Sequence, residues 1–216
     1  MENVLRAFLW GAMGVLAFLL VIGTTFLAAR MVGPTVDNLM TGTANVSPSG
    51  APPPGPEVPA FSFSDQEGRS VSREALRGRV WIAAFILPQC SGTCPATSAK
   101  MARLQDRIRD RRVQLVSFSM EPSRDTAALK AYAAQFHADP ERWHLLTGSR
   151  TDSVRVAAAI GVASHLAQRP EDIIHSDRLV LIDVTGRARG SYAVDDDQAM
   201  DRLAINAVAL AENAAR

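Results

Sequence analysis

Cysteine is scarce in this chain, which has only two in 216 residues. Two cysteines cannot form the disulfide framework on which small secreted domains depend, so the fold must rest on its own apolar core. Charge of one sign is not in excess either, because 23 basic side chains are balanced by 22 acidic ones. Such a chain lacks the basic surface that binds nucleic acid, and we expect no nucleic-acid partner.

Charged residues are absent from one long segment near the start of the chain. Residues 7–29 carry none, and an α-helix of this length spans about 35 Å, enough for a hydrocarbon core of about 30 Å. A cleaved signal peptide is the alternative, but its apolar region has only about 7 to 15 residues, and Phe26 or Leu27 stands where its cleavage motif needs a small side chain. We therefore expect residues 1–31 to be a single transmembrane anchor. Arginines flank both ends of the span, so the charge rule does not decide its orientation.

Large apolar residues are almost missing from residues 32–59. This segment is rich in Gly, Ser and Thr and holds seven of the 12 prolines of the chain. Such a composition cannot build a core, so we expect a flexible linker that reaches at most about 85 Å. It is either a plain spacer or a tether that lets the domain meet a membrane-bound partner. The remaining residues, 60–216, suit a single domain in length.

Residues 60–216 show the strand and helix periodicities of a globular domain. Strands alternate with helices in the central part, which predicts β-α-β units and a mainly parallel sheet. With a two-strand entry, a closing hairpin and a final helix, this order predicts an α/β fold, a thioredoxin-like domain. The expected strands are 61–64, 71–76, 80–87, 113–118, 143–146, 178–183 and 188–194, and the expected helices are 95–112, 125–136, 153–160 and 197–214.

Several side chains that could carry chemistry have a simpler interpretation. We expect the sulfur atoms of Met101 and Met120 to lie in the core, because Met101 falls on the apolar stripe of its helix and Met120 ends a strand. We expect three histidines at the surface or in loops: His137, His144 and His165. We expect four arginines at a solvated helix end or on a docking face: Arg107, Arg109, Arg111 and Arg112.

The two cysteines are close together, in the sequence Cys-Ser-Gly-Thr-Cys-Pro directly after the apolar strand 80–87. Pro95 fits the first position of a helix, so Cys90 and Cys94 lie at a helix N-terminus, which favours the thiolate. Thiolates in such a position either exchange disulfides or bind a soft metal. The C-x-x-x-C loop is one residue longer than the C-x-x-C of thioredoxins, so the sulfurs can separate around an ion. This spacing favours metal binding without excluding redox chemistry.

Several further segments accompany the cysteine motif. They are 117–122 (SFSMEP), 124–126 (RDT), Trp143, 146–148 (LTG) and His175-Ser176 before the hairpin 179–192. With these segments the chain resembles the Sco/SenC family of membrane-tethered copper proteins that serve cytochrome c oxidase assembly. The resemblance covers most of residues 60–215.

The resemblance implies that Cys90, Cys94 and His175 are copper ligands. Two thiolates and one imidazole form a soft, low-coordinate set suited to Cu(I), and it stays open whether Cu(II) is also held. Zinc would normally take a fourth ligand, and no further cysteine is available. The implied partners are a cytochrome c oxidase subunit or another cuproprotein, a thiol reductant, and the membrane through the N-terminal anchor. The implied location is the inner (cytoplasmic) membrane, with the domain on the periplasmic side.

The sequence also departs from the family pattern. The family often has Pro after the first cysteine, where Ser91 stands here, and Asp where Glu121 stands. An Asp commonly precedes the ligand histidine, where this chain has Ile174. A ligand imidazole is usually oriented through its other nitrogen, so His175 needs a backbone carbonyl, a water or Asp177 for this purpose.

Two redox enzymes are the alternatives to a metallochaperone. In a thiol-disulfide oxidoreductase Cys90 would attack, Cys94 would resolve, and His175 would not be needed. Such enzymes carry a cis-proline immediately before the closing strand, and Pro170 comes too early in this sequence. A peroxidase of the peroxiredoxin type fits less well, because its Pro-x-x-x-Thr-x-x-Cys arrangement is missing. We therefore expect a copper chaperone, with the oxidoreductase as the second interpretation.

Overall fold

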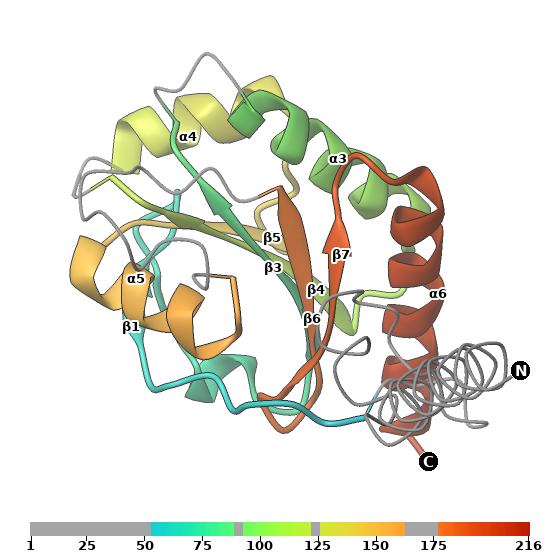
Figure 1. Cartoon of the computed structure of the whole chain (residues 1–216). Helices are drawn as coiled ribbons and strands as arrows, with labels where there is room; N and C mark the ends of the chain where they lie inside the picture. Colours follow the sequence, from blue (N-terminus) through green and yellow to red (C-terminus); the bar gives the residue numbers. More distant parts are fainter. Residues whose placement is uncertain (1–52, 89–92, 122–125, 163–176) are drawn as a thin grey trace, which may run out of the picture. The chain divides into compact units, whose positions relative to one another are not determined.

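The computed structural model describes residues 53–88, 93–121, 126–162 and 177–216, which form a mixed α/β, thioredoxin-like domain (Figure 1). Its centre is a five-stranded sheet in the order β5-β4-β3-β6-β7. The five strands are β3 (Val80–Ile86), β4 (Val113–Ser119), β5 (Trp143–Leu146), β6 (Arg178–Ile182) and β7 (Ala188–Ala193).

The sheet is mixed rather than mainly parallel, which corrects the prediction from the sequence. Strand β4 pairs in parallel with both β3 and β5. Strand β6 runs antiparallel to β3, and β7 runs antiparallel to β6. The β-α-β alternation covers only β3, β4 and β5. Strand β6 enters the sheet from the edge at which β3 ends, so its direction is reversed.

Both faces of the sheet are covered, which explains why all seven residues of β3 and of β4 are buried. One face packs against α3 (Thr93–Arg107), α4 (Thr126–Gln135) and α6 (Asp197–Asn213). The other face packs against α5 (Arg150–Ala159) and a small hairpin (Figure 1). The hairpin consists of β1 (Ser62–Ser64) and β2 (Ser70–Ser72), and the short helix η1 (Glu74–Leu76) follows it. No helix in the described part of the chain is long and apolar enough to cross a membrane.

The hairpin packs onto the sheet through aromatic rings. The ring of Phe118 on β4 lies 5.2 Å from that of Phe61, 5.6 Å from that of Phe63 and 5.3 Å from that of Phe85, measured between centroids. Ser64 also exchanges backbone hydrogen bonds with Thr147, after the end of β5. Gly148 is needed at this point, because a Cβ there would lie 2.2 Å from a carbon of the Phe63 ring.

Helix α3 differs from its prediction at both ends. It begins at Thr93, so Pro95 is its third residue rather than its first, and it ends at Arg107 rather than at residue 112. The early end has a tertiary cause, because the guanidinium of Arg142 donates to the backbone carbonyls of Gln105 and Ile108. These carbonyls at the helix end would otherwise lack a partner.

The arginines expected at a solvated helix end are partly ion-paired. Arg107 pairs with Asp201 of α6, and Arg112 pairs with Asp110 in the turn after α3. Met101 and Met120 are buried, as predicted, with exposed fractions of 0% and 2%.

Residues 55–58 are packed onto the domain, ahead of the expected domain start at residue 60. The backbone amides of Gly55 and Val58 donate to the carbonyls of Ala188 (2.7 Å) and Gly186 (2.8 Å). Val58 is fully buried, and Glu57 pairs with Arg73. We call residues 55–58 the entry strap. The strap contacts the β6–β7 turn, at the edge of the sheet where β3 begins (Figure 1).

Candidate metal centre

Of the three residues expected to hold copper, the structure describes only the backbone of one. Cys90 and His175 lie outside the described residues, as does the transmembrane span expected at residues 7–29. The backbone of Cys94 is described as the second residue of α3, and its side chain is not. The structure therefore gives the elements that lead to the candidate ligands, and the ligand set stays a prediction.

The strands on either side of the candidate ligands meet at one edge of the sheet. Strand β3 ends at Ile86, four residues before Cys90, and β6 begins at Arg178, three residues after His175. The antiparallel register pairs Trp81 with Ile182 and Ala83 with Val180, so the exit of β3 lies beside the start of β6. The end of β4 shares this edge, because the amide of Met120 donates to the carbonyl of Ile86 (2.9 Å). Open α/β sheets bind their ligands at this kind of edge, beyond the carboxyl ends of the parallel strands.

The second turn of α3 is anchored to α4 by a pair of hydroxyl groups. Ser98 lies four residues after Cys94 and is fully buried, and its Oγ lies 2.7 Å from the phenolic oxygen of Tyr132. Thr97, beside it, is 2% exposed. No sequence pattern predicts this pair, because neither residue belongs to a motif and the contact joins two helices.

Carboxylates near this edge are few within the described residues. Glu121 is half-buried, and its amide donates to the hydroxyl of Ser119 (3.2 Å). Asp177 is exposed, and its backbone carbonyl accepts from the amide of Val194 (2.7 Å). No group of three His, Cys, Asp or Glu side chains that could hold a metal ion occurs among the residues that the structure describes.

His144 corrects the expectation of a surface or loop histidine. It is the second residue of β5, its side chain is 15% exposed, and its ring nitrogens lie 3.3 Å from Asp65 Oδ2 and 3.3 Å from Gln114 Oε1. Burial lowers the pKa of His144 below its ordinary value, although the nearby carboxylate of Asp65 opposes this effect. The short strand Trp-His-Leu-Leu gives no alternation that would show this. His137, by contrast, is exposed, as expected.

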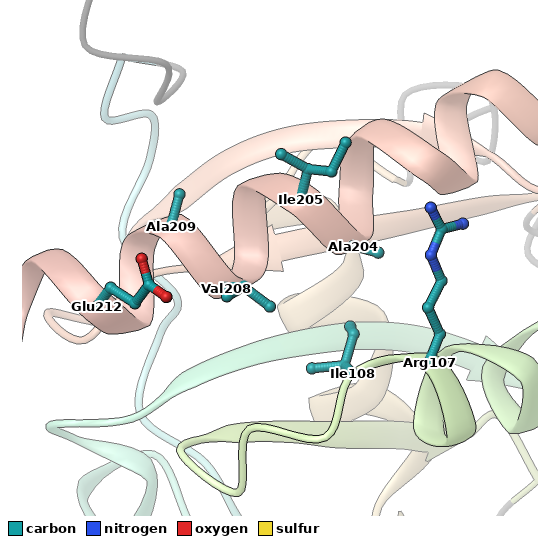
Figure 2. A pocket seen from close by; sticks show the side chains of 7 residues that line it. All are labelled: Arg107, Ile108, Ala204, Ile205, Val208, Ala209 and Glu212. Carbon is teal, nitrogen blue, oxygen red and sulfur yellow. The ribbon is translucent and has the colours of Figure 1, made fainter.

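A shallow groove of about 400 Å³ lies between the end of α3 and α6, at the other end of α3 from Cys94 (Figure 2). Ile108 and Val208 line it, and Arg107 extends from α3 toward α6 (Figure 2). Ile205, on the rim, is 63% exposed. The groove has no side chain that binds a soft metal, so it does not belong to the candidate centre.

Taken together, the strand order and a helix that starts beyond the exit of the central strand define a thioredoxin-like protein with a candidate site at the strand ends. The sequence pattern of the SCO1/SenC family matches residues 50–209. The chain therefore belongs to the SCO1/SenC family.

Known relatives agree with this membership. The SCO1 protein homolog of Bacillus subtilis is 32% identical over 142 residues, which cover 63% of this chain and 73% of that protein. The structure of BsSco, a member of the Sco family of cytochrome c oxidase assembly proteins in which a disulfide switch was identified, is 29% identical with a TM-score of 0.64. The match covers 74% of this chain and 97% of BsSco. Bradyrhizobium japonicum ScoI, solved with copper bound, shares the fold at 19% identity and a TM-score of 0.55, over 71% of this chain and 99% of that one.

Proposed function

We propose that the chain is a metallochaperone that carries Cu(I) to the copper centre of a respiratory cytochrome c oxidase, with copper as its cargo. Cys90, Cys94 and His175 would be the ligands. The observation that carries the proposal is a shared edge of the sheet. There β3 ends shortly before Cys90 and β6 begins shortly after His175, and Cys94 is the second residue of the helix that follows β3. Family membership and the copper-bound relative support the choice of metal.

Covalent geometry limits how far the candidate ligands lie from this edge. Consecutive α-carbons are about 3.8 Å apart, so two residues span at most about 8 Å. The α-carbon of Cys90 is therefore within about 8 Å of that of Pro88, and the α-carbon of His175 is within about 8 Å of that of Asp177. Cys94 follows within α3 itself. These limits keep Cys90 close to the end of β3 and His175 close to the start of β6.

The donor set suits a cargo that must be released. Thiolate and imidazole ligands are soft and favour Cu(I), and three ligands leave room for a ligand of the recipient protein. Two thiolates around one monovalent ion carry a net negative charge. The N-terminus of α3 is the positive end of the helix dipole, so it stabilises this charge. Asp177 or a backbone carbonyl would orient the imidazole of His175, since Ile174 cannot.

A thiol-disulfide oxidoreductase is the second candidate, and the disulfide switch described for BsSco favours it. In this reaction the thiolate of Cys90 attacks a disulfide of a partner cuproprotein and forms a mixed disulfide. Cys94 then attacks Cys90, which releases the reduced partner and leaves a Cys90–Cys94 disulfide. An external thiol reductant returns two electrons and two protons to the pair.

The first experiment counts copper on the reduced full chain. We expect one Cu(I) per chain, and no tight binding after Cys90 and Cys94 are oxidised to a disulfide, because oxidation consumes both soft ligands. His175→Ala should weaken Cu(I) binding at least about tenfold, in line with the penalties for disturbed metal sites. His137→Asn is the matched control, because His137 is exposed in a loop. Two or more tightly bound ions, or full retention by Cys94→Ala, would contradict the proposal.

The same variants separate the two candidate functions in cells. A copper chaperone needs His175, whereas dithiol exchange does not. Oxidase assembly should therefore fail with His175→Ala as well as with Cys90→Ser. Assembly that survives His175→Ala and fails with Cys90→Ser would establish the oxidoreductase instead.

We also propose that residues 1–31 form a single membrane span and that the domain lies on the periplasmic side of the inner membrane. The uncharged segment 7–29 and the family membership support this arrangement. A reporter that is active only in the periplasm, fused after Arg216, should be active. Activity of a cytoplasmic reporter alone at the same position would overturn both the orientation and the delivery of copper on that side.

A further inference from the structure

We infer that Tyr132 is a positioning residue for the candidate copper site, and that it acts through Ser98 on the first turn of α3. The inference rests on the proposed function, because it concerns how Cys94 is held. The observation behind it is the buried pair of hydroxyl groups, 2.7 Å apart, that joins α4 to the second turn of α3, one turn after Cys94.

The pair lies one helical turn from Cys94. In an α-helix the amide of residue 98 pairs with the carbonyl of residue 94, and side chains tilt toward the N-terminus of the helix. The hydroxyl of Ser98 and its partner on Tyr132 therefore cover the turn that contains Cys94. Tyr132 is itself fixed, because it is 5% exposed and its ring packs 5.0 Å from that of Phe136.

A stability role alone does not explain two hydroxyl groups at this place. Met101 and Leu129, which neighbour them along α3 and α4, belong to one apolar core, together with Ile86. Replacing both partners of a buried hydrogen bond by apolar groups of the same shape can be nearly neutral for stability. A hydrogen bond differs from apolar contact in being directional, so this pair fixes the distance and rotation of the helix start relative to α4.

Loss of Tyr132 alone has a specific consequence for Cys94. A serine hydroxyl without another partner can bond the carbonyl four residues earlier, which often bends the helix. For Ser98 that carbonyl belongs to Cys94. Tyr132 thus gives the Ser98 hydroxyl a partner outside the turn that carries the ligand.

The test compares the only two tyrosines of the chain. Tyr132→Phe removes the hydroxyl near Cys94. The matched control is Tyr192→Phe, which removes a hydroxyl that accepts a hydrogen bond from Asn206 of α6 (2.9 Å). Each variant of the full chain is measured for Cu(I) affinity by competition with a chelator, for the midpoint reduction potential of the Cys90–Cys94 disulfide, and for its midpoint in urea.

We expect Tyr132→Phe to weaken Cu(I) binding about tenfold, as outer-shell substitutions do, while Tyr192→Phe leaves it unchanged. The reduction potential of Tyr132→Phe should shift to a more negative value, because a displaced helix start stabilises the reduced thiolates less. The double variant Ser98→Ala/Tyr132→Phe should be no weaker than Tyr132→Phe alone, since the two hydroxyls act as one pair.

Two results would overturn the inference. One is equal behaviour of Tyr132→Phe and Tyr192→Phe in affinity and potential, whatever their midpoints in urea. The other is an additive loss in the double variant. If the parent chain binds no Cu(I), the proposed function fails, and the reduction potentials still decide whether Tyr132 positions the thiol pair.

Discussion

At the scale of single residues, Asp65 shows how the domain keeps a buried carboxylate charged. Its side chain is fully buried and accepts hydrogen bonds from the amides of Glu67 (2.9 Å) and Arg69 (2.8 Å) and from the guanidinium of Arg69 (2.9 Å). Burial raises the pKa of Asp65, but these hydrogen bonds outweigh it and hold the pKa below its ordinary value. The turn between β1 and β2 therefore encloses a charged carboxylate, and the ring of His144 lies beside this carboxylate.

His144 makes stability dependent on pH. Its pKa is lowered in the folded chain by burial, so the unfolded chain takes up the proton first as the pH falls. The free energy of unfolding should be unaffected by His144 above about pH 6.5 and should fall as the pH is lowered from there toward the folded pKa. Urea unfolding at a series of pH values between 8 and 5 measures this slope.

Two variants test the assignment to His144. His144→Asn should flatten the slope, because the titrating group is gone. His137→Asn should leave it unchanged, since His137 is exposed and Asn tolerates its positive φ of 51°. An unchanged slope in His144→Asn would show that another group titrates.

Residue-scale features of this kind were the least predictable from the sequence. The burial of Met101 followed from its place on an apolar stripe. His144 was expected at the surface or in a loop. Its burial could not be predicted, because it depends on contact with Asp65, 79 residues away in the sequence. The contact between Ser98 and Tyr132 was not predictable for the same reason, since hydrophobic periodicity carries no information on which polar side chains meet across two elements.

At the scale of elements, the central strands were easier to predict than helix ends, whereas the strand expected at 71–76 ends at Ser72 and is followed by the short helix η1. The apolar runs of β3 and β4 are buried on both faces and stand out in the sequence. The apolar periodicity of α3 predicts where the helix packs, but Arg142, a distant residue, ends it. The start of α5 was placed at Ser153, although Ser149 caps the helix by accepting from the amide of Asp152 (3.4 Å).

Gly148 is the point at which the β1–β2 hairpin meets the end of β5. Gly148→Ala should lower the free energy of unfolding by about 1 to 3 kcal/mol, because the new methyl group overlaps the Phe63 ring and the packed core cannot yield freely. Urea unfolding monitored by circular dichroism measures the change.

The effects of substitutions at Phe63 and Gly148 on the free energy of unfolding should be coupled. Phe63→Leu frees space beside Gly148, so the double variant Phe63→Leu/Gly148→Ala should lose less stability than the sum of the two single variants. Additive losses would mean that the cost of alanine at position 148 has another origin, such as its backbone conformation.

At the scale of the whole molecule, the family and the class of fold were predictable, and the ligand geometry was not. The cysteine motif and the distant His175 led to the Sco/SenC resemblance, and the family match over residues 50–209 confirms it. The converging ends of β3 and β6 agree with a site there. The sequence could not show that the domain includes the entry strap, because residues 55–58 have a linker composition and their contacts are to distant residues, in the β6–β7 turn and at Arg73.

Because of the entry strap, the stability of a soluble fragment should depend on the residue at which the fragment begins. A fragment of residues 53–216 should be more stable than one of residues 60–216 by about 2 to 4 kcal/mol, from the burial of Val58 and the lost backbone hydrogen bonds. Val58→Ala in the longer fragment separates the apolar part of this effect from the backbone part. Equal urea midpoints for the two fragments would show that the strap adds nothing to stability.

The strap also determines at which edge of the sheet the preceding chain joins the domain. It attaches at the edge where β3 begins, and the candidate site lies beyond the end of β3, about 20 Å away along seven residues of strand. If residues 1–31 hold the chain in a membrane, as proposed, the domain is tethered at the edge of the sheet where β3 begins, and the candidate copper site lies at the opposite edge. A recipient protein would then approach the candidate site from the side of the domain that is remote from its point of attachment.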